Sequence, residues 1–535
     1  MSRVVEADVL VVGGGLAGIV VALECLRAGR SVTLVDRDAP QRLGGLALWA
    51  FGGMALVGTP LQQRLRVPDS PQRALRDWLR FGELGADEVW PRRWAAHYVE
   101  HCRADVHDWL RAHGLRFVPA LHWVERGRHG EGNSLPRYHL VWGTGRELVR
   151  RLVQALHAAA ARSRLQLLHG LRVDALDLAA GQPCGAFAVQ ESDGATWQLR
   201  APAVVLACGG INGSLEQVRA HWPAQRRMPA QMLNGAHPHC DGRLHDWAAE
   251  HLQARVTHAG EMWNYAAGVA HPQAHFAGHG LGLVPCKSAL WLDHLGVRIG
   301  PEPLVTGFDT HWLCQRVAEQ QRPYTWHLLN RRIALRELAI SGAEHNPSLR
   351  ERSRLGLARE LLFGNHRLLQ RMLRESPEFL ADPTLAGLAA RMNALTGSDD
   401  VRAEVLQATV EAFDAQFTRG LSLCNDDQVR RVLQARQWPA ERLRTCRPGP
   451  LARPGAGPFI AIRSRLVTRK SLGGLQTDLR SRVLDDRGQA LPGLYAVGEA
   501  AGFGGGGASG RRSLEGTFLP GCILTARAAA RALTS

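Results

Sequence analysis

The amino-acid sequence predicts an α/β fold: a Rossmann-like dinucleotide-binding domain into which a segment of α+β character is inserted. Two observations predict it. The sequence up to Asp36 reads as strand, glycine turn, helix and strand, which is a βαβ unit. Strand-and-glycine character returns from Gly457 onward, whereas residues near 259–450 lack it. Because 535 residues are too many for one compact core, we expect residues 1–258 and 455–535 to form the dinucleotide-binding domain and residues 259–454 to form a capping, substrate-binding domain.

The opening βαβ unit has three regular elements. Ala7–Val12 is a short β-branched run, and Leu16–Ala28 has helical spacing and ends at Gly29. Ser31–Asp36 is a second apolar strand. The order and lengths of these runs predict that the two strands pair in parallel on either side of one crossover helix.

A glycine motif joins the first strand to the helix. Gly13, Gly15 and Gly18 have the GxGxxG spacing directly after the strand. The first glycine permits the tight turn, the second lets the backbone approach a pyrophosphate, and the third allows close helix–strand packing. The first turn of the helix, with Leu16 and Ala17, then offers N–H groups and a partial positive charge to the phosphates.

An acidic residue ends the second strand. Asp36 can accept hydrogen bonds from the adenosine ribose, and its charge would repel a 2′-phosphate, which argues against NADP. Its neighbour Arg37 is assigned to the same cofactor site.

The remaining elements follow in order. A helical, Trp-rich region is expected from Ser70 to His113, and a loop rich in Gly, His and Arg over Arg126–Gly145. A helix is then expected over Arg146–Arg162, followed by three strands of a meander at Leu165–Leu178, Ala186–Ser192 and Thr196–Leu199. A buried strand over Ala203–Cys208 runs into Gly209-Gly210, and the last element is a helix over Gly521–Leu533.

The net charge of +16 comes almost wholly from arginine, since Lys287 and Lys470 are the only lysines. The arginines form no block and no interleaved aromatic platform, so a role in holding an anionic cofactor and substrate explains them more simply than a nucleic-acid partner. The ten cysteines lack metal-clip or redox-pair spacing, and no metal site is expected. With neither a membrane-length apolar run nor a signal-peptide pattern, we expect a cytoplasmic protein.

The C-terminal part indicates which dinucleotide binds. Gly493–Glu499 is a strand that runs into Gly498 and an acid, a pattern that many flavoproteins use for the ribityl chain and pyrophosphate. Together with Ala207–Gly210 it predicts the two-dinucleotide-fold layout and therefore FAD.

A set of ordered motifs then carries a family resemblance. The chain resembles the flavoprotein family of fumarate reductase, succinate dehydrogenase and the 3-ketosteroid dehydrogenases, and within it the branch of FAD-binding dehydrogenases. The resemblance implies hydride transfer to or from flavin N5 at a C–C bond next to a carbonyl or carboxylate, with a small-molecule substrate and a separate electron acceptor. The motifs lie at residues 43–45, 49–53, 133–137, 142–145, 471–478 and 514–518.

The resemblance also implies further FAD contacts. Family members with covalent FAD carry a histidine just before the Gly-Gly pair, whereas this chain has Gln41-Arg42-Leu43, so non-covalent FAD is predicted. Gly44, Gly45 and Leu46 should line the flavin, and Val173 should contact the adenine. Asp241 stands where the family has an acid of the FAD domain, and Ala207 and Gly209 lie at the end of the buried strand. The ribityl chain and the ring should be held by Gly498, Glu499, Gly516, Thr517 and Phe518.

Arg512 is the first catalytic candidate, because similar enzymes place a carboxylate-binding arginine in this loop; Arg511 is the alternative. Arg469 and Lys470 precede the Gly473-Gly474 turn where fumarate reductases have a substrate-binding histidine. A buried lysine, unlike arginine, can lose its proton. Weaker candidates, from loops that could face the flavin, are Arg137, His139, Tyr265 and His279.

The chain departs from the family pattern in two places. Ile460 stands where the ketosteroid enzymes carry a tyrosine, and with five tyrosines in all a tyrosine-rich steroid site is not expected. Gly507–Gly510 lacks the histidine that many relatives have before the arginine loop. Two alternatives stay open: a flavin-bearing protein that binds or modifies nucleic acid, suggested by the charge, and a pyridine-nucleotide-dependent flavin reductase, which would need a second GxGxxG motif.

Overall fold

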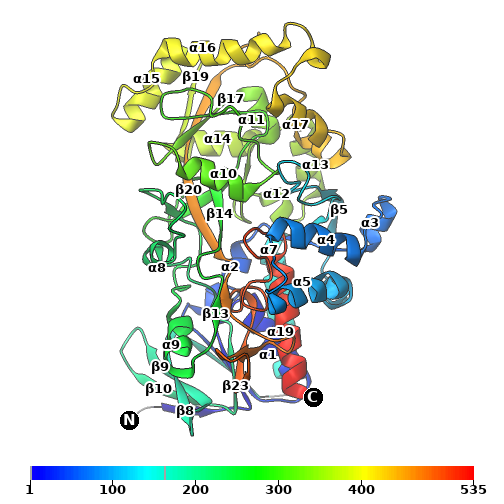
Figure 1. Cartoon of the computed structure of the whole chain (residues 1–535), viewed down its shortest axis with the longest axis vertical. Coiled ribbons are helices and arrows are strands. Elements are labelled where there is room, and N and C mark those ends of the chain that lie inside the picture. The colour runs from blue at the N-terminus through cyan, green and yellow to red at the C-terminus, as the bar shows by residue number, and fades with distance from the viewer. Residues whose placement is uncertain (1–2, 162–163) are drawn as a thin grey trace. The chain divides into compact units, whose positions relative to one another are not determined.

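The computed structural model describes residues 3–161 and 164–535 and forms two compact units (Figure 1). Unit 1 comprises Met1–Pro223, Ala236–Trp263 and Arg469–Ser535, and unit 2 comprises Ala224–Gly235 and Asn264–Thr468. Strands β14 (Met262–Ala270) and β20 (Phe459–Ser471) run across the boundaries between them. The assignment of residues 259–454 to a capping domain stays a prediction.

A six-stranded sheet is the centre of unit 1. Its order is β22-β23-β11-β2-β3-β7, and all neighbours are parallel except the pair of β22 and β23. All four residues of β2 are buried, as expected of a parallel strand that is covered on both faces. The strands are β2 (Val9–Val12), β3 (Val32–Asp36), β7 (Leu165–His169), β11 (Ala203–Leu206), β22 (Arg482–Leu484) and β23 (Ala490–Ala496).

Helix α1 (Leu16–Arg27) packs against α7 (Thr144–Ala160) and against the C-terminal helix α19 (Phe518–Thr534). Ile19, Val20 and Val21 of α1 are fully buried as a result. The C-terminus of the chain thus supplies both a strand of the central sheet and a helix that covers the first crossover helix. The predicted α/β class is confirmed, and the βαβ unit β2–α1–β3 has the expected order.

Two smaller sheets complete unit 1, with orders β1-β10-β9-β8 and β4-β6-β5, together with the pair β13–β21. Their strands are β1 (Arg3–Glu6), β4 (Gly53–Ala55), β5 (Phe117–His122), β6 (Tyr138–Val141), β8 (Leu171–Ala179), β9 (Gln182–Gln190), β10 (Thr196–Arg200), β13 (Val256–Thr257) and β21 (Gly474–Leu475). The other helices are α2 (Leu46–Trp49), α3 (Pro60–Arg64), α4 (Pro71–Gly82), α5 (Val89–His101), α6 (Trp109–Ala112), α8 (Leu215–Ala220) and α9 (Arg243–Leu252), with a π-helical stretch at Cys102–Asp108.

Unit 2 is built on a sheet of order β16-β17-β20-β14-β15-β18, with β12 and β19 also paired to β20. Its other strands are β12 (Leu233–Asn234), β15 (Gly280–Val284), β16 (Leu290–Leu292), β17 (Thr325–Asn330), β18 (Ala339–Ile340) and β19 (Phe379–Asp382). Its helices are α10 (Thr310–Ala318), α11 (Arg331–Glu337), α12 (Pro347–Arg350), α13 (Arg354–Phe363), α14 (His366–Glu375), α15 (Leu385–Thr396), α16 (Ala403–Asp414), α17 (Asp427–Ala435) and α18 (Pro439–Arg444).

The structure corrects three local predictions. The expected loop Arg126–Gly145 contains strand β6, and the following helix begins at Thr144 because Gly143, with φ +108°, turns the chain there. The expected strand Leu165–Leu178 is broken at Gly170 into β7 and β8. Strand β9 begins at Gln182 rather than at Ala186. The predicted helix end at Arg162 lies outside the described residues.

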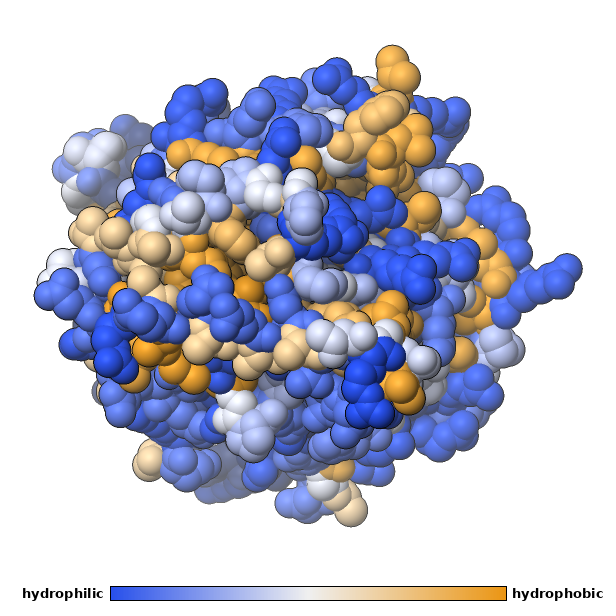
Figure 2. All heavy atoms as spheres, turned by 90° about the horizontal axis from the view of Figure 1, so that it is seen from above, coloured by the Kyte–Doolittle hydropathy of each residue, from blue (hydrophilic) through white to orange (hydrophobic). Residues whose placement is uncertain are grey.

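Apolar residues also reach the surface, and Figure 2 shows them between hydrophilic residues on one face. Leu355, Leu362 and Phe363 of α13 are 83%, 74% and 71% exposed. Among the helices that the structure describes, none is both long and apolar enough to cross a membrane.

Candidate functional site

The glycine turn after β2 is tightly packed on both sides. Gly13 has φ +110°, and a Cβ atom there would lie 2.4 Å from the carbonyl oxygen of Ala207 at the end of β11. A Cβ atom on Gly18 would lie 1.9 Å from the carbonyl oxygen of Gly13. Both distances are far below van der Waals contact, so the turn closes only with glycine at these two positions.

Gly15, between them, faces open space. It is the N-cap of α1 with φ −70°, and a Cβ atom there would have no neighbour within 4 Å among the described residues. The N–H groups of Leu16, Ala17 and Gly18 in the first turn have no acceptor within the helix, because the preceding residues are outside it. This helix end therefore offers donors and a partial positive charge to a space without protein atoms, which fits a pyrophosphate.

The Gly44-Gly45 pair borders the same space. The N–H of Gly44 donates to the carbonyl oxygen of Gly14 at 2.8 Å, and a Cβ atom on Gly45 would lie 3.4 Å from the Cα atom of Gly15. Leu46 begins helix α2 directly afterwards. Two glycine segments that are about thirty positions apart in the sequence thus lie side by side, and their contacts with flavin and pyrophosphate stay predictions.

The carboxylate of Asp36 holds the turn from the end of β3. It accepts hydrogen bonds from the backbone N–H of Gly14 and, at 2.7 Å, from that of Asp38. Its contact with a ribose stays a prediction. The neighbouring Arg37 pairs with Asp241 at 3.2 Å, so the structure brings together two residues that were assigned to the cofactor.

The other predicted contacts at this end of unit 1 differ in exposure. Arg37 also pairs with Glu191 at 2.8 Å and keeps part of its side chain in solvent. The side chain of Val173 on β8 is buried, with 7% of the residue exposed. Any contact of Val173 with adenine therefore stays a prediction.

The C-terminal segment reaches the first turn of α1. A Cβ atom on Gly498 would lie 3.0 Å from the Cβ atom of Ala17, and the N–H of Gly498 donates to Oγ1 of Thr525 in α19 at 2.8 Å. The segment after β11 turns at Gly209, with φ +80°. Residues far apart in the sequence therefore surround the N-terminus of α1, as a two-dinucleotide fold requires.

Glu499 lies beside the end of β20. Its Oε1 atom accepts a hydrogen bond from the N–H of Ser471 at 2.9 Å, and a Cβ atom on Gly210 would lie 2.7 Å from it. Burial raises the pKa of Glu499 to about 7, although the charge of Lys470 opposes the shift. The site thus contains a buried carboxyl group that can change its protonation state near neutral pH.

Lys470 is partly buried and lies against one aromatic ring. Its Nζ atom lies 4.1 Å from the centroid of the Phe518 ring, which is a cation–π contact. Burial lowers the pKa of Lys470 to about 8, and the nearby carboxylate of Glu515 opposes the shift. Glu515 itself accepts a hydrogen bond from Nε1 of Trp263 at 2.7 Å. A lysine with a pKa this close to neutrality can hold or transfer a proton.

The loop before α19 is tightly seated. The carbonyl oxygen of Gly516 accepts from the N–H of Ala55 at 2.8 Å, and Thr517 Oγ1 lies 2.9 Å from Ser513 Oγ. Tyr138 packs on this loop: a Cβ atom on Gly516 would lie 2.8 Å from its ring. The sequence prediction missed Tyr138 because β6 was expected to be a loop, although Arg137 and His139 on either side were singled out.

Arg512 forms an ion pair with Glu83, and its guanidinium lies 5.1 Å from the centroid of the Phe81 ring. Its side chain is 17% exposed, against 63% for Arg511, which approaches Glu83 to 3.6 Å. Arg512 also approaches Glu131 to 4.0 Å. Of the two arginines, Arg512 is the better buried and stays the first candidate for binding the substrate.

Two weaker candidates have structural partners. Arg137 is buried and pairs with Asp69 at 2.8 Å and Asp77 at 2.6 Å. His139 is fully buried, its Nε2 atom lies 2.8 Å from Oγ1 of Thr59, and burial lowers its pKa to about 3. These contacts stabilise the fold around β6. Tyr265, on β14, and His279, just before β15, belong to unit 2, and their catalytic roles stay predictions.

Residues 8–519 match a family described as FAD binding domain. A KsdD-like steroid dehydrogenase of Mycolicibacterium smegmatis is 40% identical over 535 residues, which cover 96% of each protein.

Solved structures share the fold. A 3-ketosteroid Δ1-dehydrogenase from Sterolibacterium denitrificans, in complex with 1,4-androstadiene-3,17-dione, superposes with a TM-score of 0.70 at 17% identity over 99% of both chains. An open conformation of a flavocytochrome c3 fumarate reductase has a TM-score of 0.68 at 19% identity, covering 99% of this chain and 78% of the other.

Proposed function

Because this chain belongs to the FAD binding domain family and is an FAD-dependent oxidoreductase that acts on a C–C bond next to a carbonyl or carboxylate, we propose that its substrate is a ketone of the steroid class. One observation of the structure carries the proposal: the ammonium group of the partly buried Lys470 lies on the Phe518 ring. An ammonium group beside an aromatic ring suits an apolar ligand that carries a carbonyl oxygen. The 40% identical relative that is named a steroid dehydrogenase supports the same class.

We assign to Lys470 the role of binding the carbonyl oxygen of the substrate. Dehydrogenation next to a carbonyl transfers a proton from one carbon to a general base and removes a hydride from the next carbon, and negative charge develops on the carbonyl oxygen. When bound, FAD supplies the hydride acceptor. The Lys470 ammonium would stabilise the developing charge, and Arg512 would orient a second polar group of the substrate. The electron acceptor that reoxidises the flavin is not assigned.

Anaerobic bleaching of the bound flavin tests the substrate class. Steroid ketones such as 4-androstene-3,17-dione are compared with small carboxylates such as succinate. We expect bleaching by the ketones. Bleaching by carboxylates alone would refute the steroid proposal and would agree with the small number of tyrosines in the chain.

Variants of the two lysines test the role of Lys470. Lys470→Gln is expected to slow flavin reduction at least tenfold with FAD still bound, because the donor to the oxyanion is lost. Lys470→Arg should keep the charge and remove the fall of the rate above about pH 8. Lys287→Gln is the matched control, since this other lysine pairs with Glu441 in unit 2. A Lys470→Gln enzyme of full activity would exclude Lys470 from the reaction. Arg512→Ala is expected to slow flavin reduction in the same assay.

Two further assignments belong to the proposal. We propose that FAD is bound non-covalently, since Leu43 precedes the Gly44-Gly45 pair. A cytoplasmic location stays a prediction from the sequence.

A further inference from the structure

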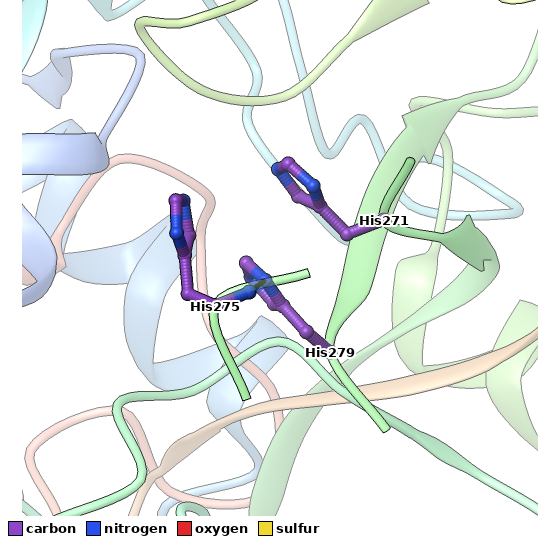
Figure 3. A group of neighbouring side chains, drawn as sticks. All are labelled: His271, His275 and His279. Carbon is purple, nitrogen blue, oxygen red and sulfur yellow. Dashed lines mark hydrogen bonds between the residues drawn. The ribbon is translucent and has the colours of Figure 1, made fainter. Parts of the chain in front are cut away.

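Three histidines meet in the loop between β14 and β15 of unit 2 (Figure 3). His271, His275 and His279 each place a ring nitrogen within 4.8 Å of the corresponding atoms of the other two. The loop is folded back on itself, since the N–H of His271 donates to the carbonyl oxygen of His279 at 2.9 Å. His271 and His279 are buried, whereas His275 is exposed, so the cluster has one side open to solvent.

A fourth histidine adds an independent observation. The ring of His345, which follows β18, lies edge-on to that of His271 with 5.7 Å between the centroids. His345 is 2% exposed, and neither of its ring nitrogens has a hydrogen-bond partner among the residues that the structure describes. A buried polar group without a partner costs free energy, and coordination of a cation by one of these nitrogens would remove that cost. This observation does not depend on the spacing of the other three histidines.

A carboxylate supports the cluster from outside. Oε2 of Glu344 lies 3.3 Å from Nε2 of His271, and Arg371 pairs with Glu344 at 2.9 Å. Histidines that bind a metal commonly donate their second ring N–H to a carboxylate, which fixes the ring and raises its basicity. Glu344 is in the right place for this role if His271 binds through Nδ1.

The ligand types favour zinc or another metal that takes imidazole ligands over calcium and magnesium. Calcium and magnesium take oxygen ligands, whereas zinc is bound by histidine nitrogen at about 2.0–2.1 Å in a tetrahedral arrangement. Ligand atoms in such a site are about 3.4 Å apart. The three nitrogens are within 4.8 Å of one another, so closure onto an ion needs shifts of about 1 Å and rotation of the rings. Binding through Nδ1 also replaces two backbone hydrogen bonds: the N–H of Gln273 donates to Nδ1 of His271 at 3.0 Å, and the N–H of His275 donates to Nδ1 of His279 at 3.3 Å.

We propose that His271, His275, His279 and His345 bind one Zn²⁺ ion, with Glu344 as the carboxylate that orients His271. The ion would tie the β14–β15 loop to the segment after β18, and β18 pairs with β15 in the same sheet. Its role is to rigidify this part of unit 2. His279 is then a structural ligand rather than a catalytic residue, contrary to the expectation from the sequence. The proposal does not depend on the proposed reaction.

Zinc titration of the full-length, FAD-loaded protein tests the site. The protein is prepared without a histidine tag, stripped with EDTA and titrated calorimetrically with Zn²⁺, and the bound zinc is counted by mass spectrometry after gel filtration. One zinc ion per chain is expected. His275→Ala should weaken binding about tenfold or more; its side chain is exposed, so the variant should fold. His345→Phe should also weaken binding.

The control is His157→Ala, an exposed histidine of α7 in unit 1, which should bind zinc as the wild type does. Zinc should raise the melting temperature of the wild type and of His157→Ala but not that of His275→Ala, because only a site formed in the folded state stabilises it. Absence of stoichiometric zinc, or equal affinity in His275→Ala and the wild type, would overturn the proposal.

Discussion

Replacing Gly15 with alanine separates cofactor binding from folding. The backbone of Gly15, with φ −70° and ψ −179°, is one that alanine adopts without strain, and the new methyl group would meet no described protein atom within 4 Å. The loss of glycine as N-cap costs a few tenths of a kcal/mol or more. The lower entropy of the unfolded chain offsets it by about 0.4–1 kcal/mol. The free energy of unfolding of the FAD-free protein should therefore change by less than about 0.5 kcal/mol.

FAD binding should respond strongly to the same change. The methyl group occupies the space through which a pyrophosphate must approach the first N–H groups of α1. Losing two hydrogen bonds to a charged group, each worth about 1.5–3 kcal/mol, costs about 3 kcal/mol or more. A loss of this size raises Kd by about 100-fold or more. Quenching of flavin fluorescence on titration of the apoprotein measures Kd, and urea denaturation measures stability.

Gly29→Ala is the matched control at the other end of α1. Gly29 also has open space around its missing Cβ, but its φ of +83° strains an alanine by about 1 kcal/mol. This variant should lose stability and keep the wild-type Kd for FAD, the reverse of Gly15→Ala. A Gly15→Ala protein that binds FAD within about threefold of the wild type would refute the placement of the pyrophosphate, since threefold is only about 0.7 kcal/mol.

Three other predictions concern ion pairing, pH dependence and the cofactor linkage. Arg137→Met leaves the buried carboxylates of Asp69 and Asp77 without this partner and should lower the free energy of unfolding, measured in urea, by about 3–5 kcal/mol. Arg150→Met, at the exposed surface of α7, is the control and should change the free energy of unfolding little. Similar effects of the two substitutions would show that the ion pairs of Arg137 are not isolated from solvent. Burial lowers the pKa of His327 to about 3, below its ordinary 6.5, so stability present above pH 6.5 should fall on acidification towards pH 3 by up to about 1.4 kcal/mol per pH unit. His327→Gln should lack this part of the slope, and equal slopes in the two proteins would contradict the assignment. Acid precipitation should release the yellow flavin into the supernatant, and colour that stays with the pellet would show a covalent bond.

The local elements of the cofactor site could be predicted because their signals are local. The βαβ unit depends on neighbouring residues: an apolar run, a glycine turn and a helix that starts at Leu16. The rarity of lysine in the sequence also predicts a special role for Lys470. FAD itself followed from Gly498-Glu499 and the family resemblance.

Other features depend on distant residues and have no local signal. Strand β6 is four residues long and is recognised by its pairing with β4 and β5, since its flanks are typical of a loop. The partner of Arg512 is Glu83, more than four hundred positions away. His271, His275 and His279 lie in a loop, where a spacing of four residues does not place side chains on one face as it does in a helix. His345 is near them only because the strand before it, β18, pairs with β15 in the sheet.

The order of the central sheet also affects how the protein is made. Strand β23, at residues 490–496, completes the sheet beside β11, and α19 covers α1. At about 5–20 residues per second, a ribosome needs roughly 20–90 s to reach β23 after it has finished the opening βαβ unit. During this time the edge of β11 and the apolar side of α1 lack their native cover, and exposed strand edges and apolar surface of this kind favour aggregation. A chain cut short before α19 would lack the helix that covers α1 and the predicted FAD contacts at residues 516–518, so we expect uptake of the cofactor only by chains that extend through α19.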